Sequence, residues 1–207
     1  MHEEKQTERV EAFSDGVFGI AMTLLVIELK VPGHDVVAAN GLARSLTALW
    51  PSYLAFVISF LTVLVTWVHH HWIFALLKRN DHAFLYWNGL LLLFVTFVPF
   101  PTALLAEYLL HPEARVAANL YTGTFLATSL AFDGLWRHAS TRLLSTNATN
   151  AKQVEAAQLT RQYRFGPPLY FGAFAVSFLS EAWSIALCLL VALFLALRVG
   201  PWARTRP

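Results

Sequence analysis

The chain has 207 residues, of which 57% are hydrophobic and only 14% are charged, and its mean hydropathy is +0.51. A soluble domain carries about 25% charged residues, so this composition excludes an ordinary soluble protein and indicates an integral membrane protein. The formal net charge of +2 gives no reason to expect a nucleic-acid partner. The single cysteine, Cys188, excludes a framework of disulfides within the chain.

Uncharged apolar segments follow one another along the whole chain. The runs over 45–68 and 83–106 are each longer than the roughly 20 residues that a helix needs to cross the hydrocarbon. Shorter uncharged runs cover 116–132, 165–180 and 182–197. We therefore predict an all-α polytopic fold, a single domain over 1–207 with six transmembrane helices. The predicted helices lie near 9–31, 46–74, 83–108, 114–138, 163–181 and 182–199.

The basic residues between these helices predict an orientation. Of the fifteen Lys and Arg residues, twelve fall on the side of the membrane that holds the N-terminus, and only Lys30, Arg44 and Arg115 fall on the other side. Loops rich in Lys and Arg stay in the cytosol. We therefore expect a multi-pass protein of the cell membrane with both termini cytosolic.

The first predicted helix carries more charge than a lipid-facing helix tolerates. Arg9, Glu11, Asp15 and Glu28 lie in or at the edge of its apolar run, and the uncharged stretch over 16–27 is only about 18 Å long at 1.5 Å per residue. Carboxylates inside a membrane almost always face protein or water. We expect this helix to be central and shielded from lipid by the other five. In the alternative interpretation, Arg9 and Asp15 mark a helix end at the membrane interface.

The charged end of this helix carries a recognisable motif. Arg9-x-x-x-Phe13-Ser14-Asp15, followed by "GVFGIAMTLLVIEL", resembles the signature of the transmembrane protein 175 family. The six-helix layout and the segment "TWVHHHWIF" add to the resemblance. The resemblance implies a cation-selective leak channel that prefers potassium, with the first helix lining the pore. A chain with one set of helices is similar to the prokaryotic form, which assembles as a homotetramer.

One stripe of the first helix is suited to line a pore. Ile20, Leu24 and Ile27 recur at helical spacing with Thr23 beside them. Fourfold symmetry turns such a stripe into stacked hydrophobic rings, which can gate by dewetting. The resemblance places these four residues at the family's pore positions. In the alternative interpretation, the stripe faces lipid or packs in the core. No Gly-Tyr-Gly triplet occurs, so we expect potassium selectivity without a filter of backbone carbonyls.

Three consecutive histidines end the second predicted helix. His69, His70 and His71 point about 100° apart on a helix, so they cannot hold one metal ion together unless the helix unwinds. We expect these histidines, with Trp67 and Trp72, to join a polar network at the base of the first helix. The partners there are Arg9, Phe13, Ser14 and Asp15, which form a structural latch. An interfacial belt and a metal site remain alternatives.

The sequence therefore favours a potassium-selective leak channel with a hydrophobic constriction. Its partners are potassium ions, the lipid bilayer and further copies of the chain. A proton-coupled or ion-exchanging transporter is the alternative, because Asp15, Glu28 and the histidines can carry protons. No Ser-His-Asp, metal-ligand or phosphate-loop spacing is present, so we expect neither an enzyme nor a cofactor.

Overall fold

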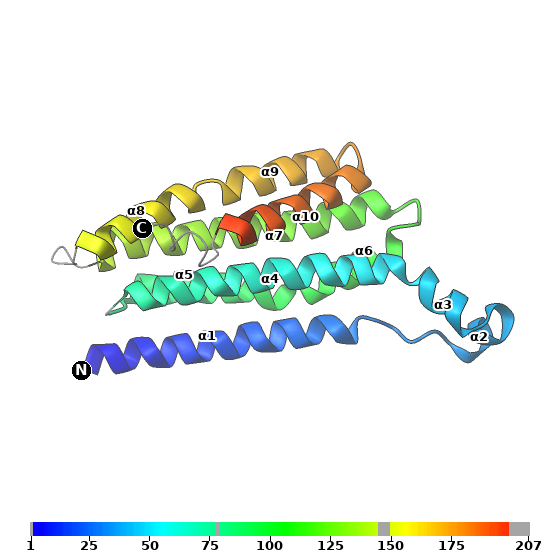
Figure 1. Cartoon of the computed structure of the whole chain (residues 1–207), viewed down its shortest axis with the longest axis horizontal. Coiled ribbons are helices and arrows are strands. Elements are labelled where there is room, and N and C mark those ends of the chain that lie inside the picture. The colour runs from blue at the N-terminus through cyan, green and yellow to red at the C-terminus, as the bar shows by residue number, and fades with distance from the viewer. Residues whose placement is uncertain (1, 78, 145–149, 199–207) are drawn as a thin grey trace, which may run out of the picture.

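A computed structural model describes residues 2–77, 79–144 and 150–198 (Figure 1). This part of the chain is mostly helical and contains no strand, which confirms the predicted all-α class. The helices are α1 (His2–Ile27), α2 (His34–Asn40), α3 (Leu42–Ala48), α4 (Trp50–Leu76), α5 (His82–Phe97), α6 (Pro99–Tyr108), α7 (Ala114–His138), α8 (Asn150–Tyr163), α9 (Gly166–Ser177) and α10 (Glu181–Arg198). A π-helical turn, Ala139–Leu143, extends α7.

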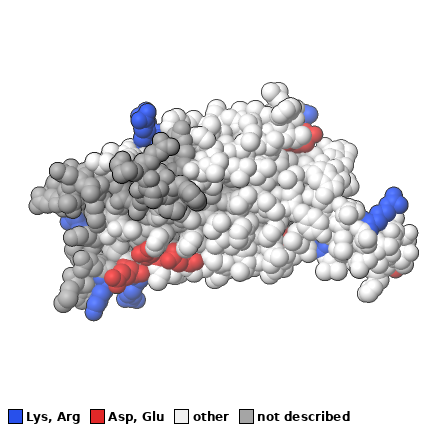
Figure 2. Space-filling model, viewed as in Figure 1, with Lys and Arg blue, Asp and Glu red and all other residues white. Residues whose placement is uncertain are grey.

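Three helical stretches are long and apolar enough to cross a membrane: Lys5–Ile27, Trp50–Leu76 and His82–Tyr108. Glu181–Leu197 is apolar but shorter. On the face drawn in Figure 2, charged side chains gather toward the two ends of the long axis and leave the middle almost uncharged. Such a belt suits the hydrocarbon of a bilayer. Lys78, Arg204 and Arg206, which the predicted orientation counts, lie outside the described residues.

The helix limits differ from the prediction where proline or a polar turn intervenes. The helix predicted over 9–31 begins at His2 and ends at Ile27, because Val31 precedes Pro32 and Lys30 turns to pair with Glu107 at 3.0 Å. The helix predicted over 46–74 begins later, at Trp50, directly before Pro51.

The remaining predicted helices also differ in detail. The helix predicted over 83–108 is divided at Val98, immediately before Pro99, into α5 and α6. The helix predicted over 114–138 coincides with α7, whereas that predicted over 163–181 is the shorter α9, and that predicted over 182–199 is α10. The prediction did not include α2, α3 or α8.

Within one chain, α1 lies along one edge of the bundle rather than at its centre (Figure 1). It packs mainly on α4 and α5, through the fully buried Phe18, Ala21 and Leu25. The expectation that the other five helices of the same chain surround α1 is therefore wrong. The hydrophobic core instead centres on α4 and α7, so a central position for α1 requires further copies of the chain.

Polar and steric contacts fix how the other helices pack. The Ser59 hydroxyl lies 2.7 Å from that of Thr102 and 3.0 Å from that of Tyr121, which ties α4 to α6 and α7. Farther along α7, a Cβ atom at Gly134 would collide with the ring of Trp87, so only glycine permits this approach of α5. These contacts hold the frame against which α1 rests.

Candidate functional site

The outer face of α1 carries the apolar stripe that the sequence predicts. Ile20 is 59% exposed, Leu24 41% and Ile27 69%, whereas the opposite face of the same helix is buried. Thr23 is also exposed, and its hydroxyl donates to the carbonyl oxygen of Ile20 at 2.8 Å. The oxygen of Thr23 therefore keeps its lone pairs free to accept. These four residues do not belong to the core of this chain, so the core-packing interpretation is excluded.

The base of α1 is tied to α4 through Asp15. The indole Nε1 of Trp67 donates to Asp15 Oδ1 at 2.8 Å, across 52 residues of sequence. Asp15 is half-buried between the two helices. A charge-assisted hydrogen bond of this kind is stronger than one between neutral groups, so it fixes the position of α1 against α4.

From Ser14, the residue before Asp15, a second polar chain joins α1 to α5 and α4. The buried Ser14 hydroxyl donates to the carbonyl oxygen of Val10 at 2.8 Å and accepts from Asn88 Nδ2 at 2.9 Å. The other end of the Asn88 amide, Oδ1, accepts from His70 Nε2 at 2.8 Å. All three side chains are buried, so each bond replaces water that the site excludes.

Asn88 is a member of this network that the sequence analysis did not select. The signal was present, because Asn88 is the one amide inside the apolar run over 83–106. A buried amide inside such a run needs partners on neighbouring helices. Its partners could not be named from the sequence, because the spacing between Ser14, His70 and Asn88 follows from how the helices pack.

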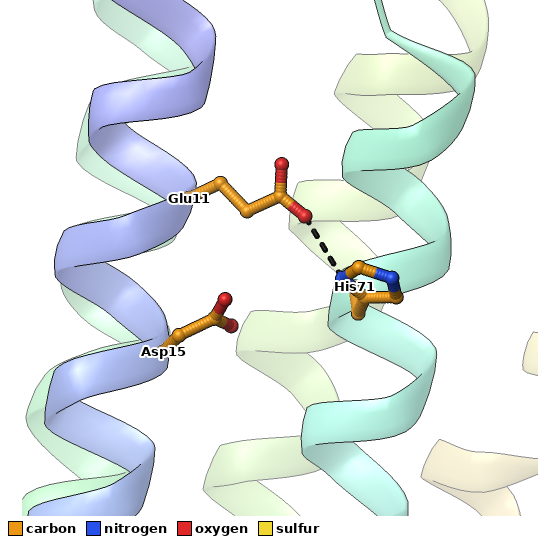
Figure 3. A group of neighbouring side chains, drawn as sticks. All are labelled: Glu11, Asp15 and His71. Atoms are coloured by element: carbon orange, nitrogen blue, oxygen red, sulfur yellow. Dashed lines mark ion pairs between the residues drawn. The ribbon is translucent and has the colours of Figure 1, made fainter.

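Glu11, Asp15 and His71 form a third contact between α1 and α4 (Figure 3). His71 Nδ1 lies 2.9 Å from Glu11 Oε1, and the ligand atoms of all three residues lie within 4.8 Å of one another. Two carboxylates and an imidazole form a donor set of the kind that binds divalent metals. Here the Glu11–His71 pair and the bond from Trp67 already engage one atom of each residue.

The three histidines face three different surroundings, as their helical spacing requires. His71 pairs with Glu11, and His70 bonds to Asn88. His69 turns away from α1 and packs edge-on against the rings of Tyr163, Phe132 and Trp72. His69 and Trp72 therefore join an aromatic cluster on the far side of α4.

Two residues of the predicted latch do not take part in it within this chain. Arg9 is exposed, and no side chain in the described ranges forms an ion pair with it. Phe13 is 67% exposed. The structure thus brings Ser14, Asp15 and Trp67 together with His70 and His71. By helical spacing, Arg9 and Phe13 lie on the same exposed face of α1 as the apolar stripe.

Comparison with known proteins decides the family. The family model described as "Endosomal/lysosomal potassium channel TMEM175" matches residues 9–99, which include most of α1 and all of α2 to α5. A potassium channel of Chamaesiphon minutus is 60% identical over 198 residues, which are 95% of this chain and 96% of that protein. The chain belongs to the TMEM175 family. This is a family of ion channels and not of enzymes, and the resemblance seen in the sequence is confirmed.

A solved structure extends the similarity to the whole fold. The crystal structure of a lysosomal potassium-selective channel TMEM175 homolog from Chamaesiphon minutus matches with a TM-score of 0.87 and 57% identity, over 95% of this chain and 99% of that one. A more distant relative is the human endosomal/lysosomal proton channel TMEM175, 38% identical over 105 residues. The match covers 48% of this chain and only 21% of the human protein.

Proposed function

We propose that the protein is a potassium-selective leak channel of the cell membrane, in which α1 of each of four identical subunits lines a central pore. The observation that carries the proposal is the exposed stripe of α1 at the edge of the chain. The similarity to a potassium channel and to a potassium-selective channel structure supports the choice of ion.

A single chain cannot form this pore. Ile20, Leu24 and Ile27 lie on one open face, and no other helix in the described part of the chain covers them. Around a fourfold axis, the same face becomes three stacked rings of branched aliphatic side chains, with a ring of Thr23 hydroxyl oxygens between them. Arg9 and Phe13 keep their place in the proposed latch as contacts between copies.

Selectivity in such a pore does not use backbone carbonyls. The backbone of α1 is helical from Ile20 to Ile27, so its carbonyl groups point along the helix axis and not into the pore. An ion that passes three aliphatic rings must lose part of its hydration shell, and this cost is smaller for potassium than for sodium. The hydroxyl oxygens of Thr23 offer the only side-chain acceptors on the stripe.

The proposed topology has six membrane spans, with both termini in the cytosol. Three spans qualify by length and hydropathy, and α7, α9 and α10 are the other three. These helices have 25, 12 and 18 residues. At 1.5 Å per residue, α9 is about 18 Å long, so the end of α8 must complete its crossing. The bonds at Ser14 and Asp15 hold the cytosolic base of α1 in place.

Reconstitution into liposomes tests the proposal. Purified protein should carry potassium faster than sodium at every voltage, without a proton gradient, and cysteines placed along α1 should cross-link in a fourfold pattern. A stable monomer, or vesicles that remain impermeable to potassium, would contradict the proposal. A cysteine placed at position 190 of α10, where Leu190 is 59% exposed, is the control that should not cross-link.

Proton-coupled or ion-exchanging transport is the second candidate. The observation that favours it is the group of Glu11, Asp15 and His71 at the base of α1, together with the name of the human relative, a proton channel. The same liposomes decide between the candidates when proton and potassium fluxes are measured separately. Potassium flux that requires a proton gradient supports the transporter, and flux that does not require one supports the channel.

A further inference from the structure

A buried histidine faces a cavity on the side of α4 opposite the pore stripe. His69 is 4% exposed, and neither of its ring nitrogens has a hydrogen-bond partner within the described part of the chain. Its ring lies 5.0 Å from that of Tyr163 and 6.1 Å from that of Phe132, centroid to centroid. Aromatic rings satisfy neither the N–H donor nor the nitrogen acceptor that a neutral imidazole carries.

The cavity beside His69 has a volume of about 50 Å³ and lies between α4, α7, the junction of α8 with α9, and α10. A water molecule needs roughly 10–15 Å³ of such space, so the cavity admits a group of a few heavy atoms. Three threonines on its wall, Thr62, Thr66 and Thr128, donate their protons to carbonyl oxygens of their own helices at 2.8 Å. The oxygens of Thr66 and Thr128 remain as acceptors toward the cavity, whereas the Thr62 oxygen already bonds with the hydroxyl group of Tyr170.

The lining selects an uncharged ligand. Among the residues that the structure describes, no acidic side chain, Lys or Arg lies on the wall, and most of the wall is the carbon of aromatic and aliphatic side chains such as Phe125, Tyr170 and Leu195. A ligand that suits His69 must either donate to or accept from a ring nitrogen, according to the tautomer, and a hydroxyl group can do both. An apolar pocket with a few convergent polar groups is the usual form of a small-molecule site.

The entrance lies on the outer surface of the bundle. Val65, Thr66, Ser129, Phe132 and Leu195 are half-buried, whereas the other residues of the wall are buried. The rim is therefore formed by α4, α7 and α10, among the apolar surfaces that face hydrocarbon in the proposed topology. A ligand reaches the cavity from the bilayer.

We propose that this cavity binds the hydroxyl end of an uncharged amphiphile of the aliphatic-alcohol class, with the alkyl chain leaving past Val65 and Leu195. The hydroxyl group bonds to one ring nitrogen of His69. It donates to that nitrogen in the tautomer that leaves it unprotonated, and in the other tautomer it accepts from the N–H and donates to a threonine oxygen. The site rests on the membrane placement of the proposed function and not on the pore. His69 immediately precedes His70 and His71, so the ligand contacts the turn of α4 that holds the base of α1.

Photolabelling tests this site. The protein in liposomes is labelled with an octanol that carries a diazirine, and the adducts are located by mass spectrometry. Adducts should concentrate on residues of the cavity, such as Phe132 and Tyr163. An excess of 1-octanol should remove them, and n-octane should not, because it lacks the hydroxyl group. Adducts spread over the lipid-facing surface, or equal competition by n-octane, would overturn the proposal.

Two variants separate the cavity from general partitioning. The His69→Phe variant lacks the imidazole, so competition by 1-octanol should weaken about tenfold. This is the loss of affinity expected for one hydrogen bond. The Leu195→Trp variant keeps His69 but fills the half-buried rim, so it should also lose the adducts, and it serves if the first variant does not fold. His34→Phe in α2, an exposed histidine away from the cavity, is the matched control. Labelling that stays the same in both cavity variants, or never reaches the cavity because only water enters it, would contradict the site. The readout does not depend on ion flux.

Discussion

Trp67 holds Asp15 by a single hydrogen bond of 2.8 Å, and this bond joins the helix that carries the apolar stripe to the frame of the bundle. Asp15 is half-buried, so its carboxylate has lost part of its water and depends on the indole N–H. The bond lies five residues before Ile20, which is about one and a half turns of helix. It therefore sets the position of the stripe without contributing to it.

Replacing Trp67 by Phe should destabilise the assembled protein by about 1–3 kcal/mol, because the Asp15 carboxylate loses its indole donor. Thermal unfolding in detergent measures the loss, and potassium preference should remain unchanged in the protein that still assembles. Trp183→Phe is the control, since Trp183 is 71% exposed. A variant of normal stability with altered ion preference would mean that this bond acts on the pore itself.

Replacing Asn88 by Leu should also destabilise the protein by about 1–3 kcal/mol, because His70 Nε2 and Ser14 lose a buried partner. Ser14 keeps its bond to the carbonyl of Val10, so most of the cost falls on His70. In a double-mutant cycle with Ser14→Ala, the stability lost in the double mutant should be smaller than the sum of the losses in the two single mutants. Full additivity would show that Ser14 and Asn88 do not act through one network. Asn40→Leu, at an exposed site, is the control.

Asp81, which lies outside the membrane-spanning segments, should make the stability of the protein depend on pH. It precedes α5 and accepts from the backbone N–H of Phe84 at 2.8 Å and from His138 Nε2 at 2.9 Å. Partial burial raises the pKa of the Asp81 carboxyl, but these two donors outweigh it, so the pKa lies below its ordinary value of 3.8. The charged form is thus favoured in the folded state.

A carboxyl whose pKa is lowered by folding contributes stability that is present above its unfolded pKa and is lost as the pH falls through the folded pKa. The melting temperature should therefore fall as the pH drops below about 4, the ordinary pKa of an aspartate. In Asp81→Asn this component should be absent, and the melting temperature at neutral pH should be lower. An equal acid dependence in both proteins would assign the effect to other groups. Asp35→Asn, at an exposed aspartate, is the control.

The uncharged runs made the long helices predictable, because no soluble core helix keeps an apolar stretch of that length. The same pattern did not determine which face of α1 is exposed. Phe18, Ala21 and Leu25 are as apolar as Ile20, Leu24 and Ile27, so hydrophobicity is similar on both faces, and only the packing on α4 and α5 decides which one is buried. The resemblance to a family supplied the choice that periodicity could not make.

The polar network shows the same limit. Consecutive histidines had to diverge, because a helix turns 100° per residue, and the structure separates them accordingly. Which of them met Asn88, Glu11 or the cavity depended on where α5, α1 and α7 lie around α4. These helix positions follow from tertiary contacts, which one sequence alone does not contain.

Ile20 gives the sharpest test of the stripe. It is the first position of the exposed apolar stripe after Asp15, it is 59% exposed, and four copies around an axis form a ring that water leaves readily. The amide of Ile20→Asn should wet this ring. If the barrier falls by about 1.4 kcal/mol, the potassium current should rise about tenfold at every voltage. Potassium preference should weaken and persist in part, because Thr23 and Leu24 remain.

Ile20→Phe should act in the opposite direction, since a larger ring side chain narrows or closes the same constriction. Opposite effects from two substitutions at one position separate a pore residue from one that merely supports the fold, for which both changes would reduce current. Leu190→Asn places the same amide at an equally exposed site on α10, which is 59% exposed, and should leave conductance unchanged. Currents from the four proteins, recorded at matched amounts of tetramer, decide the matter. Normal conductance in an assembled Ile20→Asn channel would place Ile20 outside the pore, and the stripe would then have to face lipid or a neighbouring helix.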